Sequence, residues 1–267
     1  MRSKQARTRT PGDLVFGRVS FENNRNIDVL LLEIGNTTIK LARPLGDDTF
    51  MLERFASADE LLRRIERLDG DIVCAPVGAP LSGRLVDRLA KRGATIVTSA
   101  TLAGFIGSSY DTPETLGVDR VLNLLGLDHD AVVISCGTAI TVDARIGGRP
   151  VWGAIMPGFT TAAAGLHHRI PALPLVEITR EPRLPARTSV DSVTNGVLIG
   201  TARAAQGLAD ELARAIPSRP DFPIVLTGGD AQILERLWGS TTAMPIVDEM
   251  LVFTGMVKSR ASNGSHG

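Results

Sequence analysis

The sequence predicts an α/β protein built from two similar halves with a cleft between them. Short apolar runs typical of buried strands alternate with helical patterns along the chain. The segment Val132–Ala144 also repeats the pattern of Leu30–Ala42, about one small domain further along. Each copy has an apolar strand, a polar residue, a spacer, a glycine, small polar residues and a second strand. Two matching copies favour a duplicated fold over two unrelated hairpins, although either turn alone would be an ordinary hairpin.

In the first half, the expected elements begin with a buried strand at Val29–Leu32. Ser57 and Glu60 fit a capping box, so a helix is expected over Ser57–Arg67. The other elements expected here are strands at 39–42, 50–55, 71–75 and 94–98 and a helix at 81–92.

In the second half, the pattern repeats and ends in a strand at Pro223–Leu226, followed by Thr227-Gly228-Gly229 and a short helix. The other elements expected here are strands at 131–136, 139–144 and 150–155 and helices at 159–169 and 189–215. We therefore expect an N-terminal half at 27–130 and a C-terminal half at 131–258. A flexible basic tail is expected at 1–26, and a second flexible tail at 259–267.

The composition of the chain excludes some classes of partner. The chain has 267 residues, 43% of them hydrophobic, and its 29 basic residues balance its 29 acidic residues. A nucleic-acid-binding protein usually carries a basic excess, so we expect no nucleic-acid partner. No apolar run approaches the roughly 20 residues that span a bilayer, and no apolar segment follows the basic N-terminus. We expect no membrane partner, a cytoplasmic location, and Cys74 and Cys136 as buried, reduced thiols.

The two glycine turns suit phosphate binding. Glycine lets the backbone approach a ligand closely, and successive exposed N–H groups can bind an anion. A carboxylate just before such a turn, here Glu33, can hold a hydrated Mg²⁺ against phosphate oxygens. Lys40 can neutralise charge on a phosphoryl group, with a solvent-facing lysine as an equal alternative. The candidate phosphate-contacting residues are Glu33, Gly35, Asn36, Thr37, Lys40, Gly137, Thr138, Gly228 and Gly229.

Several other nucleotide and metal sites are excluded by missing motifs. The chain lacks the GxxxxGK[ST] pattern of a P-loop and a strand-coupled GxGxxG of a Rossmann site. It also lacks HExxH and any clustered set of histidine and cysteine ligands.

A longer motif is the most specific signal in the chain. The segment Tyr110–Arg120 reads YDTPETLGVDR and resembles the YxxPxxLGxDR motif of type III pantothenate kinases, the group that includes the Bvg accessory factor proteins. The other motifs of that family follow in the same order, and the resemblance covers roughly residues 28–257. The matching segments are Glu33–Lys40, Ser135–Asp143, Gly153–Gly158, Ala172–Pro174, Ser189–Gly196 and Leu226–Gly229.

The resemblance implies a fold, an activity and partners. The fold would be the actin-like ATPase fold of acetate and sugar kinases, Hsc70 and actin, which is related to RNase H. The activity would be ATP-dependent phosphorylation of the 4′-hydroxyl of pantothenate, the first step of coenzyme A biosynthesis. The resemblance further implies Mg²⁺, a monovalent cation (K⁺ or NH₄⁺) and a homodimer.

The resemblance also assigns roles to single residues. Asp119 would be the general base that accepts the proton of the acceptor hydroxyl. Arg120 would clamp the acceptor carboxylate. The other acceptor contacts would be Tyr110, Gly117 and Val118, with Ser189 reaching the acceptor from the dimer partner. An isolated Asp-Arg pair would more simply be a favourable acid at a helix start, but the surrounding motif favours catalysis.

Three positions depart from the family pattern. Glu33 replaces an aspartate, Ser135 replaces the aspartate that helps bind the monovalent cation, and Trp152 replaces the first glycine of a GG pair. A hydroxyl carries no charge, so the monovalent-cation site is expected to be weak or absent. Three interpretations stay open: a pantothenate kinase with relaxed cation dependence, a kinase for another small hydroxy compound, or a non-catalytic binding or regulatory protein.

Overall fold

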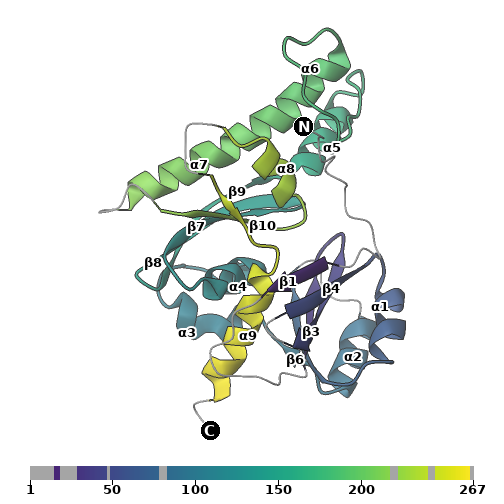
Figure 1. The fold of residues 1–267 in the computed structure, drawn as a ribbon, viewed down its shortest axis with the longest axis vertical. Helices are drawn as coiled ribbons and strands as arrows, with labels where there is room; N and C mark the ends of the chain where they lie inside the picture. Colours follow the sequence, from purple (N-terminus) through teal and green to yellow (C-terminus); the bar gives the residue numbers. More distant parts are fainter. Residues whose placement is uncertain are drawn as a thin grey trace. The chain divides into compact units, whose positions relative to one another are not determined.

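A computed structural model gives the fold (Figure 1) and describes residues 15–18, 29–46, 49–77, 83–216, 222–239 and 244–264. These residues form two compact units. The N-terminal unit contains the described residues up to Asp128 together with 250–264, and the C-terminal unit contains His129–Glu249. Each unit is an α/β structure with its own mixed sheet.

The N-terminal unit contains a sheet with the strand order β1-β4-β3-β2-β5-β6. β2 pairs antiparallel with β3 and parallel with β5, so it lies at the switch between the antiparallel and parallel parts of the sheet. The strands are β1 (Val15–Arg18), β2 (Val29–Ile34), β3 (Ile39–Gly46), β4 (Thr49–Phe55), β5 (Asp71–Pro76) and β6 (Thr95–Ile96).

Helices cover both faces of this sheet. Leu30, Leu32 and Ile34 of β2 pack in one core with the buried residues of α1 (Ala58–Ile65) and α2 (Gly83–Lys91). Side chains alternate along a strand, so Leu31 and Glu33 point to the opposite face. There α9 (Leu251–Gly264) contacts β2, and α4 (Val118–Gly126) contacts β5. Glu33 is thereby placed on the same side of the sheet as α4.

The helices α4 and α9 cross at unusually close range and lie side by side in Figure 1. A Cβ added to Gly126 would lie 2.3 Å from the carbonyl oxygen of Leu251, and one added to Gly255 would lie 2.0 Å from that of Leu122. Both positions therefore need glycine. The Lys258 Nζ donates to the carbonyl oxygens of Gly126 and Leu127, which closes the end of α4.

The C-terminal unit contains a sheet with the order β11-β10-β7-β8-β9. One face of β7 packs in a core with α5, α6 and α7. The strands are β7 (Ala131–Cys136), β8 (Ala139–Ile146), β9 (Arg149–Pro157), β10 (Ile224–Thr227) and β11 (Ile246–Val247). The helices are α5 (Phe159–Arg169), α6 (Ser189–Asn195), α7 (Thr201–Ala215) and α8 (Ala231–Arg236), with a π-helical turn at Gly196–Gly200 joining α6 to α7.

The two sheets share one topology, which confirms the predicted duplication. In each, the first strand of the repeat pairs antiparallel with the second and parallel with the fourth. The repeats differ at the turn, because Ile34 pairs with Ile39 whereas Cys136 pairs with Ile140. The second turn is one residue shorter. The two repeats therefore align without a gap only up to Gly35 and Gly137. After the turns, Lys40 and Thr141 occupy equivalent positions, because Lys40 pairs with Glu33 and Thr141 pairs with Ser135.

The expected boundaries need three corrections. Residues 15–18, inside the expected flexible tail at 1–26, form β1, because the outer edge of β4 offers backbone groups for pairing. The rest of that tail lies outside the described residues. The chain end from Met250 joins the N-terminal unit instead of the C-terminal half. Residues 259–264 continue α9 instead of forming a flexible tail, since Ser259 is buried and Arg260 pairs with Asp71.

No helix among the described residues is long and apolar enough to cross a membrane. The cleft expected between the halves stays a prediction.

Candidate active site

A row of charged side chains crosses three strands on the α4 side of the N-terminal sheet. Glu33 of β2 lies directly opposite Lys40 of β3, which in turn lies opposite Arg54 of β4. The Lys40 Nζ lies 2.7 Å from the Glu33 Oε2, and both side chains are largely shielded from solvent. The row carries two cations, Lys40 and Arg54, and groups of this type bind phosphate oxygens well.

The first glycine turn is placed at the end of this row. The Gly35 N–H donates to the Thr38 carbonyl oxygen at 3.1 Å, and this bond closes the turn between β2 and β3. Asn36 and Thr37 at its tip are exposed. A Cβ on Gly35 would lie 3.0 Å from the same carbonyl oxygen, so a larger residue would push the turn open.

The Asp119 carboxyl group lies in the first turn of α4. Gly117, in an extended conformation, precedes the helix, and the Arg120 N–H donates to its carbonyl oxygen at 3.1 Å. A Cβ on Gly117 would lie 2.6 Å from the Asp119 Oδ1. Gly117 therefore leaves room for the carboxyl group to turn back over the helix start.

Burial raises the pKa of Asp119 from its ordinary value of 3.8 to about 6. The negative charge of Glu33 adds to this rise, whereas the backbone N–H groups of residues 119 and 120 and the Arg120 guanidinium oppose it. The carboxyl group is thus ionised at neutral pH but more basic than an ordinary aspartate. A base poised near the working pH is the usual requirement for proton transfer.

The rest of the Tyr110–Arg120 motif is fixed around the start of α4. The Ser99 hydroxyl donates to the Leu116 carbonyl oxygen, which ties the loop to the preceding segment. Tyr110 is half-buried in this loop. Val118 and Arg120 are each only 5% exposed, so Val118 packs as a core residue.

The second glycine turn, in the C-terminal unit, is held by the start of α5. The Thr138 carbonyl oxygen accepts from the Gly158 N–H at 3.0 Å and from the Thr161 hydroxyl at 2.6 Å. A Cβ on Gly158 would lie 1.9 Å from the Gly137 carbonyl oxygen. Only glycine at position 158 allows this approach, and Thr138 is left exposed at the tip of the turn.

The third glycine turn follows β10 and contacts the same loop. Gly228 has a φ of +91°, and a Cβ there would lie 2.3 Å from the Cys136 carbonyl oxygen. The Asp230 N–H donates to that oxygen at 3.0 Å. Gly229 is exposed beside it, and burial raises the pKa of Asp230 to about 6. Gly137 and Gly228 are thus brought together by the Cys136 carbonyl.

Two of the departures from the family pattern lie in the C-terminal sheet. Ser135 is half-buried opposite Thr141 and Thr227. Trp152 lies opposite Asp143 at a bulge, where the Gly153 N–H donates to the Asp143 Oδ1 at 3.1 Å. The turn residue Ala139 pairs with Pro157 on β9, and Trp152 comes five residues before Pro157 on the same strand. The backbone at Trp152 is therefore about 15 Å along the strand from the turn. The indole therefore does not fill the Gly137–Thr138 turn.

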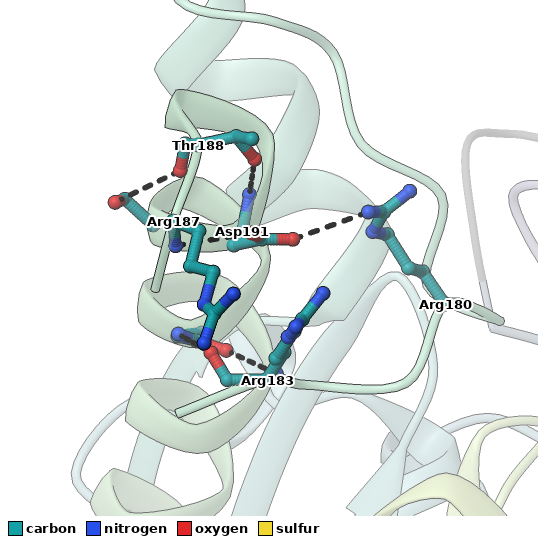
Figure 2. Close-up of polar contacts among 7 residues, drawn as sticks. Arg180, Arg183, Arg187, Thr188 and Asp191 are labelled. Atoms are coloured by element: carbon teal, nitrogen blue, oxygen red, sulfur yellow. Dashed lines mark hydrogen bonds and ion pairs between the residues drawn. The ribbon is translucent and has the colours of Figure 1, made fainter. Parts of the chain in front are cut away.

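Ser189 is exposed in the first turn of α6, and Figure 2 shows how that turn is fixed. The Thr188 hydroxyl caps the helix by accepting from the Asp191 N–H at 3.0 Å. The buried Asp191 carboxylate accepts from the Arg180 guanidinium and from the Arg187 N–H, both at 3.2 Å. The bond from the Arg187 N–H is the largest cause of a lowered pKa at Asp191. Asn195 bonds both the N–H and the carbonyl oxygen of Arg183.

The family model for type III pantothenate kinase matches residues 29–211 of the chain. The chain belongs to the type III pantothenate kinase family.

Curated relatives match across most of this family member. It is 31% identical over 256 residues to type III pantothenate kinase 1 of Symbiobacterium thermophilum, with 85% of the chain and 94% of the relative covered. It is 34% identical over 226 residues to the type III pantothenate kinase of Halorhodospira halophila, with 75% and 86% covered.

Solved structures agree on the fold. A Baf family protein from Campylobacter jejuni aligns with a TM-score of 0.59 at 22% identity, covering 88% of this chain and 99% of that chain. A chain of the PilM–PilN type IV pilus biogenesis complex aligns with a TM-score of 0.52 at 13% identity, covering 88% and 99%. With the shared topology of the two sheets, this places the chain in the duplicated actin-like ATPase fold.

One residue of the charged row was missed by sequence reasoning. Arg54 is 7% exposed and lies on the same face as Glu33 and Lys40. A usable signal was present, because two charged residues, Glu53 and Arg54, interrupt the otherwise apolar strand expected at Phe50–Phe55. A buried arginine in such a strand needs an anionic or polar environment.

Proposed function

We propose that the protein transfers the γ-phosphoryl group of ATP to the 4′-hydroxyl of pantothenate and so begins coenzyme A biosynthesis. The observation that carries this proposal is the Asp119 carboxyl group, which has a pKa of about 6 and lies within a motif shared with the family. The hydroxyl oxygen forms a bond to the γ-phosphorus, the bond between that phosphorus and ADP breaks, and Asp119 accepts the hydroxyl proton.

The acceptor side of the proposal uses the start of α4. Arg120, beside Asp119, supplies the positive charge for the pantothenate carboxylate. Tyr110, Gly117 and the backbone of Val118 line the acceptor site. Ser189 is exposed at the start of a helix that Thr188 caps, which suits its proposed contact with an acceptor bound to a partner subunit of a homodimer.

The nucleotide side uses the glycine turns. In the N-terminal unit, Gly35, Asn36, Thr37 and Lys40 would contact phosphate oxygens. In the C-terminal unit, Gly137, Thr138, Gly228 and Gly229 would do so. The support is that Asn36, Thr37, Thr138 and Gly229 are exposed at the tips of these turns, and that a Cβ on Gly35 or Gly228 would crowd a backbone carbonyl oxygen.

Glu33 could supply one of the ligands of a Mg²⁺ ion. Among the described residues, no cluster of three or more histidine, cysteine or acidic side chains could hold a metal ion alone. Mg²⁺ in nucleotide sites is commonly held by one or two carboxylates together with phosphate oxygens and water. Glu33 can supply one carboxylate, and the bound ion would neutralise charge on the phosphates. For the monovalent cation, the uncharged Ser135 supports a weak or absent site.

An ADP-release assay tests the function. The purified protein is mixed with ATP and Mg²⁺, with pantothenate or with other small hydroxy acids as the acceptor, and with or without potassium. We expect ADP to form only when pantothenate is present, and to form equally well without potassium. ADP formation with another acceptor, but none with pantothenate, would contradict the proposed substrate. A kinase of this kind acts where ATP is plentiful, so we propose the cytoplasm as its location.

A further inference from the structure

Asn123 is a buried polar residue that the roles described so far do not use. It lies in α4, is 4% exposed, and its neighbours Leu122 and Leu124 are fully buried apolar residues. Among the residues that the structure describes, none donates a hydrogen bond to the Asn123 Oδ1. A buried acceptor without a donor destabilises a protein, so such an atom calls for a ligand or another functional explanation.

Helix geometry directs this side chain to the acceptor end of α4. A helix turns by about 100° per residue, so Asn123 projects about 40° from Asp119 and about 60° from Arg120, between the two. Helical side chains lean toward the N-terminus and cover the preceding turn. The Asn123 carboxamide is therefore directed over the turn that carries Asp119 and Arg120.

We infer that the Asn123 Oδ1 binds the amide N–H of the acceptor and so selects an amide-containing substrate. This inference rests on the proposed function. In pantothenate, the amide lies between the hydroxyl that would face Asp119 and the carboxylate that would face Arg120. Asn123 lies between the same two residues on the helix. A bond from that N–H would satisfy the buried oxygen and would add recognition of the middle of the acceptor.

The experiment compares two acceptors and two proteins. The acceptors are pantothenate and its ester isostere, in which an oxygen atom replaces the amide N–H. The proteins are the wild type and Asn123→Leu, in which an apolar side chain of similar volume removes the oxygen. We expect the wild type to use pantothenate with a kcat/KM about 10- to 100-fold higher than for the ester. In Asn123→Leu this preference should fall to about 3-fold or less, with the KM for ATP unchanged.

A matched control and the melting temperature separate this role from a structural one. Thr194→Val removes another fully buried side-chain oxygen, on α6, that has no hydrogen-bond partner in the described part of the chain, and it should keep the wild-type preference for pantothenate. Asn123→Leu should melt at or above the wild-type temperature, because it removes an unsatisfied polar group. A clearly lower melting temperature would instead assign Asn123 a structural partner and would overturn the inference.

The kinetic outcomes are distinguishable from failure of the proposed function. If the wild type phosphorylates pantothenate and both proteins prefer it over the ester equally, the Asn123 assignment is wrong and the proposed function stands. If the wild type phosphorylates neither acceptor, the proposed function fails and the inference fails with it.

Discussion

Replacing Asp119 by asparagine removes the ionisable group and keeps its shape, so it tests the proposed base and the effect of burial together. The substitution should lower the rate of phosphoryl transfer by about 10²- to 10⁴-fold, because asparagine cannot accept the hydroxyl proton. The KM for ATP should change little. In the wild type, log kcat/KM should rise with pH and level off above about pH 6, where Asp119 becomes ionised.

The same substitution should stabilise the fold. The pKa of Asp119 rises from 3.8 to about 6, a shift of about two units, and each unit corresponds to about 1.4 kcal/mol. Between these pH values the folded protein binds more protons than the unfolded chain, so wild-type stability falls as pH rises through this window. Above pH 6, ionised Asp119 therefore costs up to about 3 kcal/mol. Asparagine avoids this cost but bonds the helix start less strongly, so a net gain of about 1–2 kcal/mol is expected.

Thermal unfolding at pH 5 and pH 8, paired with steady-state kinetics, measures both effects. At pH 8, Asp119→Asn should melt about 2–8 °C above the wild type, and at pH 5 the difference should shrink. Asp230→Asn is a useful comparison, since its carboxyl group has the same raised pKa and no proposed role in proton transfer. Near-normal turnover in Asp119→Asn would refute the proposed base. A lower melting temperature at pH 8 would refute the burial argument.

Three further predictions concern acceptor binding, cation response and packing. Arg120→Ala should raise the KM for the acceptor at least about 10-fold with a smaller effect on kcat, and an unchanged KM would contradict the carboxylate clamp. Ser135→Asp should create or strengthen a response to potassium, measured as activity against added salt, and a flat response would remove the cation assignment. Gly255→Ala should lower the free energy of unfolding by about 2–4 kcal/mol because its Cβ would lie 2.0 Å from a carbonyl oxygen. Gly165→Ala, in a helix with open space around its Cβ, should be neutral or stabilising in the same denaturation experiment.

Much of the fold follows from local sequence patterns. The apolar runs at Val29–Leu32 and 131–136 appear as the central strands β2 and β7, and the repeat appears as the shared topology of the two sheets. Ser57 caps α1 through the capping box that predicted this helix, and Glu60 reaches back to the Ala56 N–H. These features depend on neighbouring residues, so one sequence is enough to predict them.

The features that sequence reasoning missed depend on contacts between distant residues. The position of α9 beside α4 results from Gly126 and Gly255, whose partners are more than a hundred residues away in the chain. β1 forms because the edge of β4 is open, which no local pattern in residues 15–18 reveals. The one-residue difference between the two repeat turns likewise becomes visible only in the strand register.

The candidate site, like the fold, was predicted where its residues are neighbours in the sequence and missed where they are distant. The motif around Asp119 gave its residues directly, because they are contiguous in the chain. The contribution of Glu33 to the pKa of Asp119 could not be predicted, since it requires β2 and α4 to face one another. Arg54 and Asn123 become candidate site residues only once the structure shows that their side chains are buried.

The most direct test of the central claim is the mass of the product formed by the wild-type protein and by Asp119→Asn, side by side, from pantothenate, ATP and Mg²⁺. We predict that the wild type forms ADP and a pantothenate derivative heavier by one phosphoryl group, phosphorylated at the 4′-hydroxyl, and that Asp119→Asn forms at most about one hundredth as much in the same time. Unchanged pantothenate after prolonged incubation with the folded wild-type protein would contradict the account.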